Sequence, residues 1–336
     1  MSKKILIITD NEKEQINGVV TTFSNIEVHA LQCGHTVDYI CPGNFKHCGA
    51  PGYPEVKLSW PWQIGRLIQE KQSDHIHIAT EGPIGLWGRI ACDKLGWRYN
   101  TSYHTRFPDF MQAIYGIPPS LTWTYLRWFH RHSGVVLTTT HTMVDDLRAH
   151  GFRGTIRPWT RGVDRTALSA TVPHSDRYLP LPVRVLYVGR VSREKNLDAL
   201  CQLQDQYQIE IVGDGPYRSY LEKHYPKVEF LGYQTGTELA NSYARADVFA
   251  FPSRADTFGI VMIEALSLGT PVAAYAVPGP IDIVEPGITG HLGENLAHSI
   301  DIAAKLDRKR VEQASQCWTW EQCWRIFEEN LVPVRG

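Results

Sequence analysis

The sequence has almost no net charge and no long hydrophobic run. Its 336 residues carry 34 Lys and Arg against 35 Asp and Glu, a formal net charge of −1. Binding to a nucleic-acid backbone needs a concentrated cationic surface, so this balance disfavours a nucleic-acid partner. No window approaches the roughly 20 apolar residues of a membrane-spanning helix, and Ile5–Ile8 is too short for a signal peptide. Any membrane contact is therefore expected to be peripheral.

Paired cysteines and metal-binding spacings are also lacking. The cysteines are odd in number and show no CxxC spacing, which disfavours a disulfide framework and a zinc site. They are Cys33, Cys41, Cys48, Cys92, Cys201, Cys317 and Cys323. The sequence contains no GxGxxG array, so a dinucleotide fingerprint is absent, and no DxD-like acidic pair stands in a convincing loop. We expect reduced thiols in a cytoplasmic protein that needs no metal.

The two halves differ in charge. The first 165 residues carry 18 Lys and Arg against 14 Asp and Glu, whereas the remainder carries 16 against 21. A modestly cationic N-terminal half is suited to an anionic surface.

Short apolar runs alternate with helix-length amphipathic stretches along the chain, a pattern typical of parallel sheets with crossover helices. A first series of expected strands comprises Ile5–Thr9, Thr36–Cys41, His75–Thr80, Tyr99–His104 and Val135–Thr139. A second series comprises Arg184–Gly189, Gln208–Val212, Val228–Gly232, Val248–Phe251 and Val272–Tyr275. Between them, Ser169–Pro182 is rich in proline and polar residues. The pattern predicts an α/β protein with two doubly wound domains, the first over 1–168 and the second from 169.

Three loops of the first half carry candidate functional residues. Gly18 opens a helix whose N-terminal amides could face an anion, although a lone glycine is more often only a turn. Glu81 and His104 follow two expected strands, at the sheet edge where ligands of such folds bind. His104 could orient a sugar hydroxyl, or it could be a histidine with a purely structural hydrogen bond.

The loops of the second half are more informative. Gly189 and Arg190 end the first strand of this half, and Lys195 follows at the expected N-terminus of the next helix. Two cations beside a helix N-terminus suit a diphosphate, although a solvated charged loop would have the same composition. Gly213 marks another tight strand-to-helix turn, where backbone can approach a ligand.

The most specific segment runs from Ser253 to Ala265. Asp256 stands just before an apolar helix that begins near Phe258 and Gly259, and Glu264 lies within that helix. Such acids could bind the hydroxyls of a sugar and a ribose, while the amides near Gly259 meet phosphate. The alternative is an N-cap aspartate and a buried, hydrogen-bonded glutamate.

These segments together resemble glycosyltransferase family 4, whose members are retaining enzymes of the GT-B fold. The closest likeness is to lipid-directed members such as glycosyl- and sulfoquinovosyl-diacylglycerol synthases and related mannosyltransferases. The matching segments occur in the family's order over nearly the whole chain. They are Asn17–Val20, Ala79–Pro83, His104–Pro108, Arg161–Asp164, Gly189–Arg190 with Lys195, and Asp256–Glu264.

The resemblance implies roles for these residues. Arg190 and Lys195 would hold the donor diphosphate, Glu264 the ribose and Asp256 the transferred sugar. Gly18 would contact the phosphate from across a cleft, and His104 would lie beside the sugar. The family usually has Glu where this chain has Asp256, which leaves the reach of that carboxylate open.

The resemblance also implies that a C-terminal helix, roughly Trp320–Leu331, crosses back onto the N-terminal domain. The second domain is then 169–315, and 316–336 forms the returning segment. The donor is expected to be a nucleotide-diphosphate sugar, with a UDP-sugar favoured, and no tightly bound cofactor is expected. The diphosphate would leave as the acceptor hydroxyl attacks from the same face.

An acceptor surface is predicted on the helical stretch Ser120–His132 of the cationic half. Aromatic rings and cations suit a bilayer interface, and the residues concerned are Trp123, Arg127, Trp128 and Arg131, with Glu81 nearby at its strand end. The alternative is that these aromatic side chains pack in the core. With the lipid-directed resemblance, the stretch predicts a diacylglycerol-like acceptor on the inner, cytoplasmic face of a membrane.

Other functions share parts of this pattern. A GDP-mannose-dependent mannosyltransferase or a transferase to a soluble sugar would differ in substrate alone. A nucleotide-sugar epimerase of the same architecture would convert the donor without an acceptor, and a phosphorylase would depend on phosphate. A non-catalytic sugar-nucleotide binder would show affinity without turnover.

Overall fold

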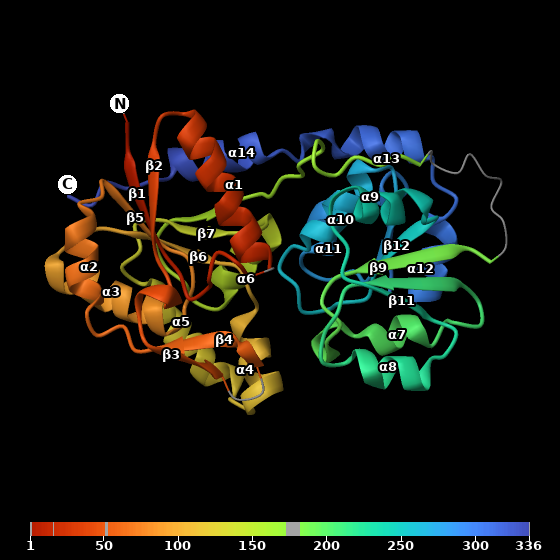
Figure 1. The fold of residues 1–336 in the computed structure, drawn as a ribbon, viewed down its shortest axis with the longest axis horizontal. Coiled ribbons are helices and arrows are strands. Elements are labelled where there is room, and N and C mark those ends of the chain that lie inside the picture. The colour runs from red at the N-terminus through yellow and green to blue at the C-terminus, as the bar shows by residue number, and fades with distance from the viewer. Residues whose placement is uncertain (1, 16, 51–52, 173–181, 336) are drawn as a thin grey trace. The chain divides into compact units, whose positions relative to one another are not determined.

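The computed structural model describes residues 2–15, 17–50, 53–172 and 182–335, and the chain divides into two compact units (Figure 1). The first unit contains Met1–Arg161 and Trp320–Gly336, and the second contains Gly162–Thr319. Most of the expected interdomain segment, residues 173–181 within Ser169–Pro182, lies outside the described residues.

The first unit is built on a parallel six-stranded sheet with the order β2-β1-β5-β6-β7-β8. Its strands are β1 (Lys4–Ile8), β2 (Thr36–Ile40), β5 (His75–Ile78), β6 (Asn100–Tyr103), β7 (Val136–Thr138) and β8 (Ile156–Pro158). The five strands expected from the sequence are confirmed to within two residues at each end, while β8 was not expected. Because β1 pairs with β2 on one side and β5 on the other, the topological switch lies between β1 and β5.

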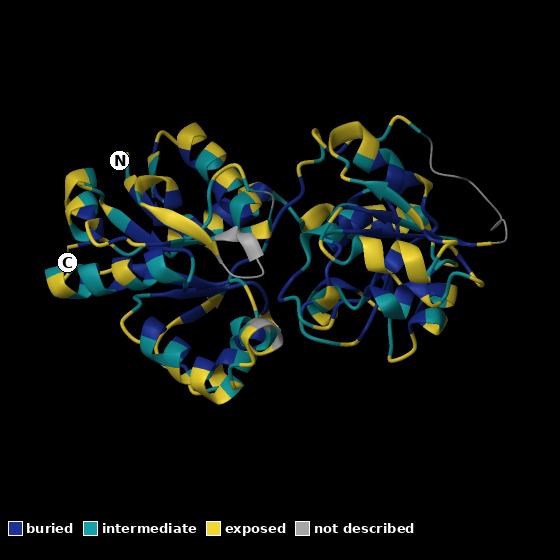
Figure 2. Ribbon diagram, turned by 60° about the horizontal axis from the view of Figure 1, so that its bottom comes forward, coloured by how far each residue is buried: buried dark blue, intermediate teal, exposed yellow. Residues whose placement is uncertain are grey.

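Burial explains why these strands read as continuous apolar runs. Ile5, Leu6, Ile7 and Ile8 are almost fully buried, since helices cover a parallel sheet on both faces. Figure 2 shows strands in the buried colour inside helices whose outer faces are exposed. These helices are α1 (Gly18–Gln32), α2 (Ile64–Lys71), α3 (Pro83–Leu95), α4 (Phe107–Tyr115), α5 (Pro119–His130), α6 (His141–Ala149) and α14 (Trp320–Glu329).

A separate antiparallel hairpin, β3 (His47–Ala50) and β4 (Tyr53–Ser59), precedes α2. This hairpin was not expected from the sequence. Its pairing is short and contains a register shift near Ala50.

The C-terminal helix α14 belongs to the first unit and packs against α1. Glu328 accepts hydrogen bonds from Lys3 at 2.8 Å and lies 2.9 Å from Nε2 of His35. On the inner side, the indole of Trp159 donates to the Cys323 carbonyl. The predicted return of the C-terminal helix onto the N-terminal part of the chain is confirmed.

The second unit repeats the plan with a parallel sheet of order β11-β10-β9-β12-β13-β14. Its strands are β9 (Arg184–Val188), β10 (Gln208–Val212), β11 (Glu229–Gly232), β12 (Val248–Phe251), β13 (Val272–Ala274) and β14 (Gly290–Leu292). The expected strands are again confirmed, and β14 is additional. The topological switch here lies between β9 and β12, because β9 pairs with β10 on its other side.

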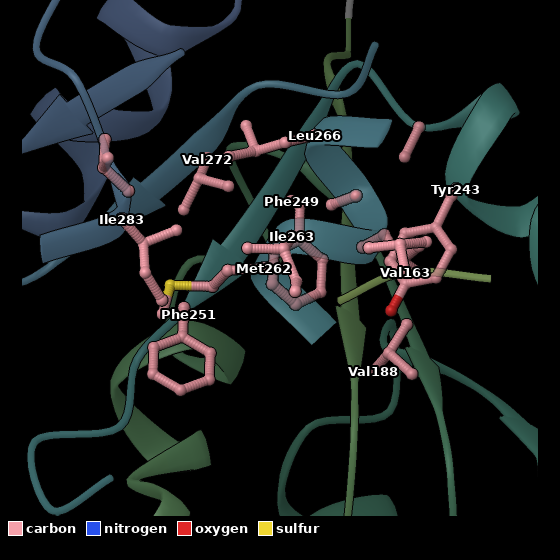
Figure 3. Packing of buried hydrophobic residues seen from close by; sticks show 14 of the residues in the cluster. Val163, Val188, Tyr243, Phe249, Phe251, Met262, Ile263, Leu266, Val272 and Ile283 are labelled. Carbon is pink, nitrogen blue, oxygen red and sulfur yellow. The ribbon is translucent and has the colours of Figure 1, made fainter. Parts of the chain in front are cut away.

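Helices cover this second sheet as well. They are α7 (Leu197–Cys201), α8 (Arg218–His224), α9 (Gly236–Arg245), α10 (Ile260–Ser267), α11 (Pro280–Ile283), α12 (Leu296–Ala303) and α13 (Arg308–Ala314). Figure 3 shows Met262 and Ile263 of α10 beside Phe249 and Phe251 of β12, in one buried cluster with Tyr243 of α9. The apolar segment Ile260–Ile263 thus supplies core contacts, while the loop before it faces the sheet's carboxyl edge.

No helix among the described residues combines the length and apolar character that crossing a bilayer requires.

Candidate active site

The loops after β9 and β12 come together at the switch point of the second sheet. Lys195 Nζ donates a hydrogen bond to Oδ1 of Asp256 over 2.6 Å. Each of the two side chains is 24% exposed, so the pair is shielded but reachable. Next to it, Asn196 donates to the carbonyl of Pro252 at 3.1 Å. Two residues predicted for the donor site, far apart in sequence, are therefore in direct contact.

The ion pair determines the charge of Asp256. Burial acts to raise the pKa of this carboxyl, but the charge and hydrogen bond of Lys195, with a further hydrogen bond from Ser253, outweigh burial and hold the pKa below its usual value. Asp256 is therefore ionised at neutral pH and can accept hydrogen bonds from hydroxyl groups.

Backbone approaches backbone closely beside this pair. Gly213, after β10, has a φ of +132°, and a Cβ there would overlap the carbonyl oxygen of Gly189. Only glycine fits such a position. Arg190 lies in the same loop as Gly189, and its carbonyl accepts a hydrogen bond from the Tyr187 hydroxyl at 3.1 Å. The predicted cation is thus on a loop tied to the buried strand β9.

Helix α10 begins directly after Gly259, which has a φ of +89°. Within the described residues, no side chain caps this helix start. Phe258 is buried and packs edge-on against Trp318, with ring centroids 5.6 Å apart. The Phe258 side chain therefore anchors the loop in the core. Any contact of residue 258 with the donor would be made by its backbone.

Glu264 lies on the second turn of α10 and accepts a hydrogen bond from the Tyr243 hydroxyl at 2.9 Å. Burial raises the pKa of Glu264, while the bond from Tyr243 opposes that rise. Sequence reasoning missed Tyr243 because it lies on α9, 21 residues earlier, within an ordinary amphipathic helix.

In the first unit, His104 follows β6 and receives a hydrogen bond from a buried arginine. Nη2 of Arg161 lies 2.8 Å from Nδ1 of His104. Burial, followed by the Arg161 charge, lowers the pKa of His104 well below its ordinary value. The sequence singled out Arg161 only as part of a matching segment, and the tertiary structure brings it to His104.

The switch point of the first sheet is occupied by Asp10, which the sequence analysis did not select. Its carboxylate accepts hydrogen bonds from the Thr80 hydroxyl and the Ile84 amide, each at 2.7 Å. Glu81 is 8% exposed, with its carboxylate 3.4 Å from Nε2 of the buried His130. Glu81 thus points into the unit rather than to an open acceptor surface.

Gly18 begins helix α1, as expected, but the amides that follow it already have an acceptor. Oδ1 of Asn17 accepts hydrogen bonds from the amides of Val19 and Val20, both at 3.0 Å. A phosphate contact at Gly18 stays a prediction.

The predicted acceptor stretch forms helix α5, and its two tryptophans pack inward. Trp123 stacks on His150 with centroids 3.8 Å apart, and Arg89 lies 3.9 Å over the ring of Trp128. Arg127 donates to the His150 carbonyl, which leaves Arg131 as the exposed cation. The packing alternative therefore describes both rings. Exposed aromatic side chains lie elsewhere in the unit, at Trp60, Trp62 and Trp87.

The described residues contain no group of three or more His, Cys, Asp or Glu side chains able to hold a metal ion. Metal-independent binding of the donor, without a tightly bound cofactor, stays a prediction.

Comparison with known families and structures agrees with this geometry. Residues 16–167 match the model for Glycosyltransferase Family 4, and residues 182–311 match that for Glycosyl transferases group 1. A GDP-mannose-dependent alpha-mannosyltransferase of Mycobacterium tuberculosis is 29% identical, covering 99% of this chain and 97% of that protein. The sulfoquinovosyl transferase SQD2 of Arabidopsis thaliana is 32% identical over 72% of this chain and 51% of that protein.

Among solved structures, sucrose-phosphate synthase of Thermosynechococcus elongatus shares the fold. The TM-score is 0.77 at 20% identity, over 97% of this chain and 98% of that one. The two parallel sheets, the returning C-terminal helix and this likeness confirm the predicted GT-B architecture. With both family models matched in order, the chain belongs to glycosyltransferase family 4 and is an enzyme that transfers sugars.

Proposed function

We propose that this enzyme is a retaining hexosyltransferase that moves a hexose from a nucleotide-diphosphate sugar to a lipid acceptor such as diacylglycerol. The observation that carries the proposal is the contact of Lys195 with Asp256 at the switch point of the second sheet. A cation for the departing diphosphate and an anion for sugar hydroxyls are thereby held side by side, where such folds bind ligands.

Each group of the donor then has a partner. Arg190 and Lys195 take the diphosphate, Asp256 takes hydroxyls of the hexose, and Glu264 takes the ribose. The uncapped start of α10 beside Gly259 supplies amides and the positive end of a helix dipole to a phosphate. From the first unit, we propose His104 as a contact to the sugar.

The reaction needs no nucleophile from the enzyme. The acceptor hydroxyl oxygen forms a bond to the anomeric carbon on the face that the diphosphate leaves, and the bond from that carbon to the phosphate oxygen breaks. The hydroxyl proton passes to the departing oxygen. Cations on the leaving group stabilise the charge that develops there in the transition state, which accelerates the step.

The relatives bear on the donor. The resemblance to the mannosyltransferase extends over nearly the whole chain, whereas that to SQD2 covers a smaller part of both proteins. GDP-mannose is therefore a donor candidate beside the UDP-sugars that the sequence analysis favours. The side chain of Asp256 is one methylene shorter than that of the Glu usual in the family. Which donor sugar Asp256 can bind therefore depends on where the hexose lies relative to its carboxylate.

A donor screen tests the proposal. The purified chain is incubated with GDP-mannose, UDP-glucose or UDP-galactose and a total lipid extract, and both nucleoside diphosphate release and glycolipid are measured. We expect one donor to give a lipid product with the donor's anomeric configuration. Release of nucleotide without an acceptor, an inverted product or inactivity with every donor would each contradict the proposal.

The proposal of a lipid acceptor is supported by the resemblance of the sequence to lipid-directed members of the family and by the surface of the first unit. Trp62 is 78% and Trp60 59% exposed, and Trp87 lies on α3 one turn before Ala91, which neighbours Gly65 of α2. Tryptophan rings prefer the headgroup region of a bilayer. We therefore propose peripheral membrane contact by this surface, together with the exposed Arg131.

Sedimentation with anionic liposomes at low and high salt tests membrane contact. We expect the unmodified chain to bind at low salt. The double variant Trp60→Ala with Trp62→Ala should bind more weakly, and Arg131→Glu should lower the affinity by roughly 1 kcal/mol or more through a lost cation. Tyr220→Ala, an exposed aromatic of the second unit, is the matched control. If the enzyme were fully active on a soluble sugar and did not bind liposomes, the lipid acceptor would be wrong and only the glycosyltransferase activity would stand.

A further inference from the structure

A cluster of two histidines and an arginine lies inside the first unit, around the residue proposed to contact the sugar. His104 follows β6, His77 is in β5, and Arg161 comes three residues after β8. The rings of Phe23 and Trp159 stand 5.9 and 5.6 Å from the His104 ring, between centroids. This surrounding is aromatic, so any charge within it is poorly solvated.

Arg161 is held in place by the backbone of its own segment. Its Nη1 donates to the carbonyls of Trp159 at 2.6 Å and Thr160 at 2.9 Å, while Nη2 reaches His104. The guanidinium also lies 4.4 Å over the Trp159 ring and is 3% exposed. Burial lowers the pKa of Arg161 to about 10, which still leaves the group charged at neutral pH.

The chemistry of the Arg161 guanidinium determines the tautomer and protonation state of His104. A charged guanidinium has only hydrogen-bond donors, so Nδ1 of His104 must accept with its lone pair. A proton on Nδ1 would place an N–H against an N–H, and a doubly protonated ring would add a second positive charge. Both arrangements are unfavourable at a separation of 2.8 Å.

We propose that Arg161 is a positioning residue that keeps His104 neutral, with its proton on Nε2. The ring then presents a hydrogen-bond donor to a hydroxyl of the transferred sugar and acts neither as a base at Nε2 nor as a cation. The identity of the sugar as the partner rests on the proposed function, whereas the protonation state of His104 does not.

The second histidine is consistent with a single cation in the cluster. Nε2 of His77 lies 2.9 Å from Oγ of Ser102, and that hydroxyl donates to the Ala79 carbonyl. His77 Nε2 therefore donates to Oγ. Burial, then the Arg161 charge, lowers the pKa of His77 to about 3. Within the part of the chain that the structure describes, the charged or titratable groups that act on the His104 pKa are Arg161 and His77, and Cys323 of α14 acts on Arg161. None of these changes its charge between about pH 5 and about 8.

Nitrogen NMR of the full chain, labelled with ¹⁵N-histidine, tests the proposal without any substrate. The His104 signals are those that disappear in His104→Gln. We expect a pyridine-type shift at Nδ1 and a pyrrole-type shift at Nε2, unchanged between about pH 5 and about 8. A pyrrole-type Nδ1, or titration near the ordinary histidine pKa, would overturn the proposal whether or not activity is found.

Substitutions add a second readout. Arg161→Met removes every donor at similar length and should allow both His104 tautomers, whereas Arg157→Met, at an exposed position of β8, should leave the spectrum unchanged. If Arg161→Met does not fold, the spectrum of the unmodified chain still decides.

In the active enzyme, His104→Gln supplies an acceptor to Arg161 and a donor to the sugar, so it should retain about tenfold more kcat than His104→Ala. Equal loss in the two variants would contradict a donor role at Nε2.

If no donor is turned over but the spectrum shows the fixed tautomer, the proposed function fails and the positioning by Arg161 stands. If sugar transfer occurs while His104 titrates near the ordinary histidine pKa, the proposed function stands and the positioning by Arg161 is wrong.

Discussion

The two units share one architecture but differ at their switch points. In the first sheet, Asp10 follows β1, and its carboxylate accepts hydrogen bonds from the amides of Ile84 and Gly85 at the start of α3. In the second sheet, the loop after β12 instead carries Asp256 paired with Lys195, and α10 starts at Gly259 without a side-chain cap among the described residues.

The difference concerns which helix start can bind an anion. Free N-terminal amides and the helix dipole attract phosphate, but a carboxylate of the protein itself competes for the same place. Asp10 fills that place in the first unit, and Asn17 caps α1 in the same way. In the second unit no described side chain caps the start of α10, and we propose that this start binds a phosphate together with Arg190 and Lys195. The same fold thus provides a structural support in one half and a candidate phosphate site in the other.

The largest expected effect comes from removing the cations of the second unit. Arg190→Ala or Lys195→Ala should reduce transfer at least about a hundredfold, because each removes a charge-assisted contact to the leaving diphosphate. Steady-state kinetics with the identified donor measure this. Arg193→Ala is the matched control, since Arg193 lies exposed in the same loop. Near-normal turnover in both site variants would remove the diphosphate site from this loop.

A second test separates the two acids. Asp256→Asn should lower kcat about tenfold or more, because the charged acceptor for sugar hydroxyls is lost. Glu264→Gln should mainly raise the KM of the donor, since a ribose contact is similar in ground and transition states. Tyr243→Phe should act in the same direction as Glu264→Gln, because it removes the hydrogen bond to that carboxylate. If Glu264→Gln changed kcat alone, its assignment to the ribose would be wrong.

In the first unit, loss of the Asp10 carboxylate should lower the free energy of unfolding. Asp10→Ala leaves the buried Ile84 amide without its acceptor and should cost about 1–3 kcal/mol of unfolding free energy. Nine of the ten tryptophans lie in this unit, so urea unfolding followed by tryptophan fluorescence reports on it. Asp145→Ala, at an exposed position of α6, is the control.

The same residue gives a pH test. Burial raises the pKa of Asp10, against the opposing effect of its hydrogen bonds. The folded-state pKa is therefore above the unfolded value, so the contribution of this group to stability is present below the unfolded pKa and is lost as pH rises through the folded pKa. Asp10→Asn should remove that part of the pH dependence. An unchanged pH profile in Asp10→Asn would show that the carboxyl is not buried as described.

The smallest effect is expected where α14 meets the rest of the first unit. Glu328→Gln breaks the partly exposed ion pair with Lys3, changes the hydrogen bond with His35, and should cost about 0.2–1 kcal/mol at neutral pH. The hydrogen bond from Lys3, opposed by burial and helped by His35, lowers the pKa of Glu328. The contribution is therefore present above the unfolded pKa and lost as pH falls through the lowered pKa. Glu329→Gln, at the exposed neighbouring position, should show no such loss in the same urea titration.

Much of the fold was predictable because the strands are buried on both faces. Runs such as Ile5–Ile8 and Val248–Phe251 are apolar throughout, and turn residues follow them. The strands that were missed are short edge strands, β8 and β14, with three residues each, and the separate hairpin β3–β4. Such segments carry too few apolar positions to stand out from loops.

The candidate site was predictable in part for a related reason. Residues at strand ends, such as Lys195 and Asp256, could be selected because parallel strands bring their carboxyl ends to one edge. The aromatic rings and cations of Ser120–His132, in contrast, indicated a surface but not what covers the Trp128 ring, over which Arg89 of another helix lies. Tyr243 and Asp10 had no motif of their own.

The sequence by itself determined the alternation of strands and helices, the two sheets and the loops that carry charge, because these depend on local pattern and chain connectivity. Only the tertiary structure decided which side chains meet. The partners Lys195 and Asp256 are 61 residues apart, and His104 and Arg161 are 57 apart. The physical reason is that a hydrogen bond depends on distances of about 3 Å, and such distances are set by the packing of whole sheets and helices rather than by residues near in the chain.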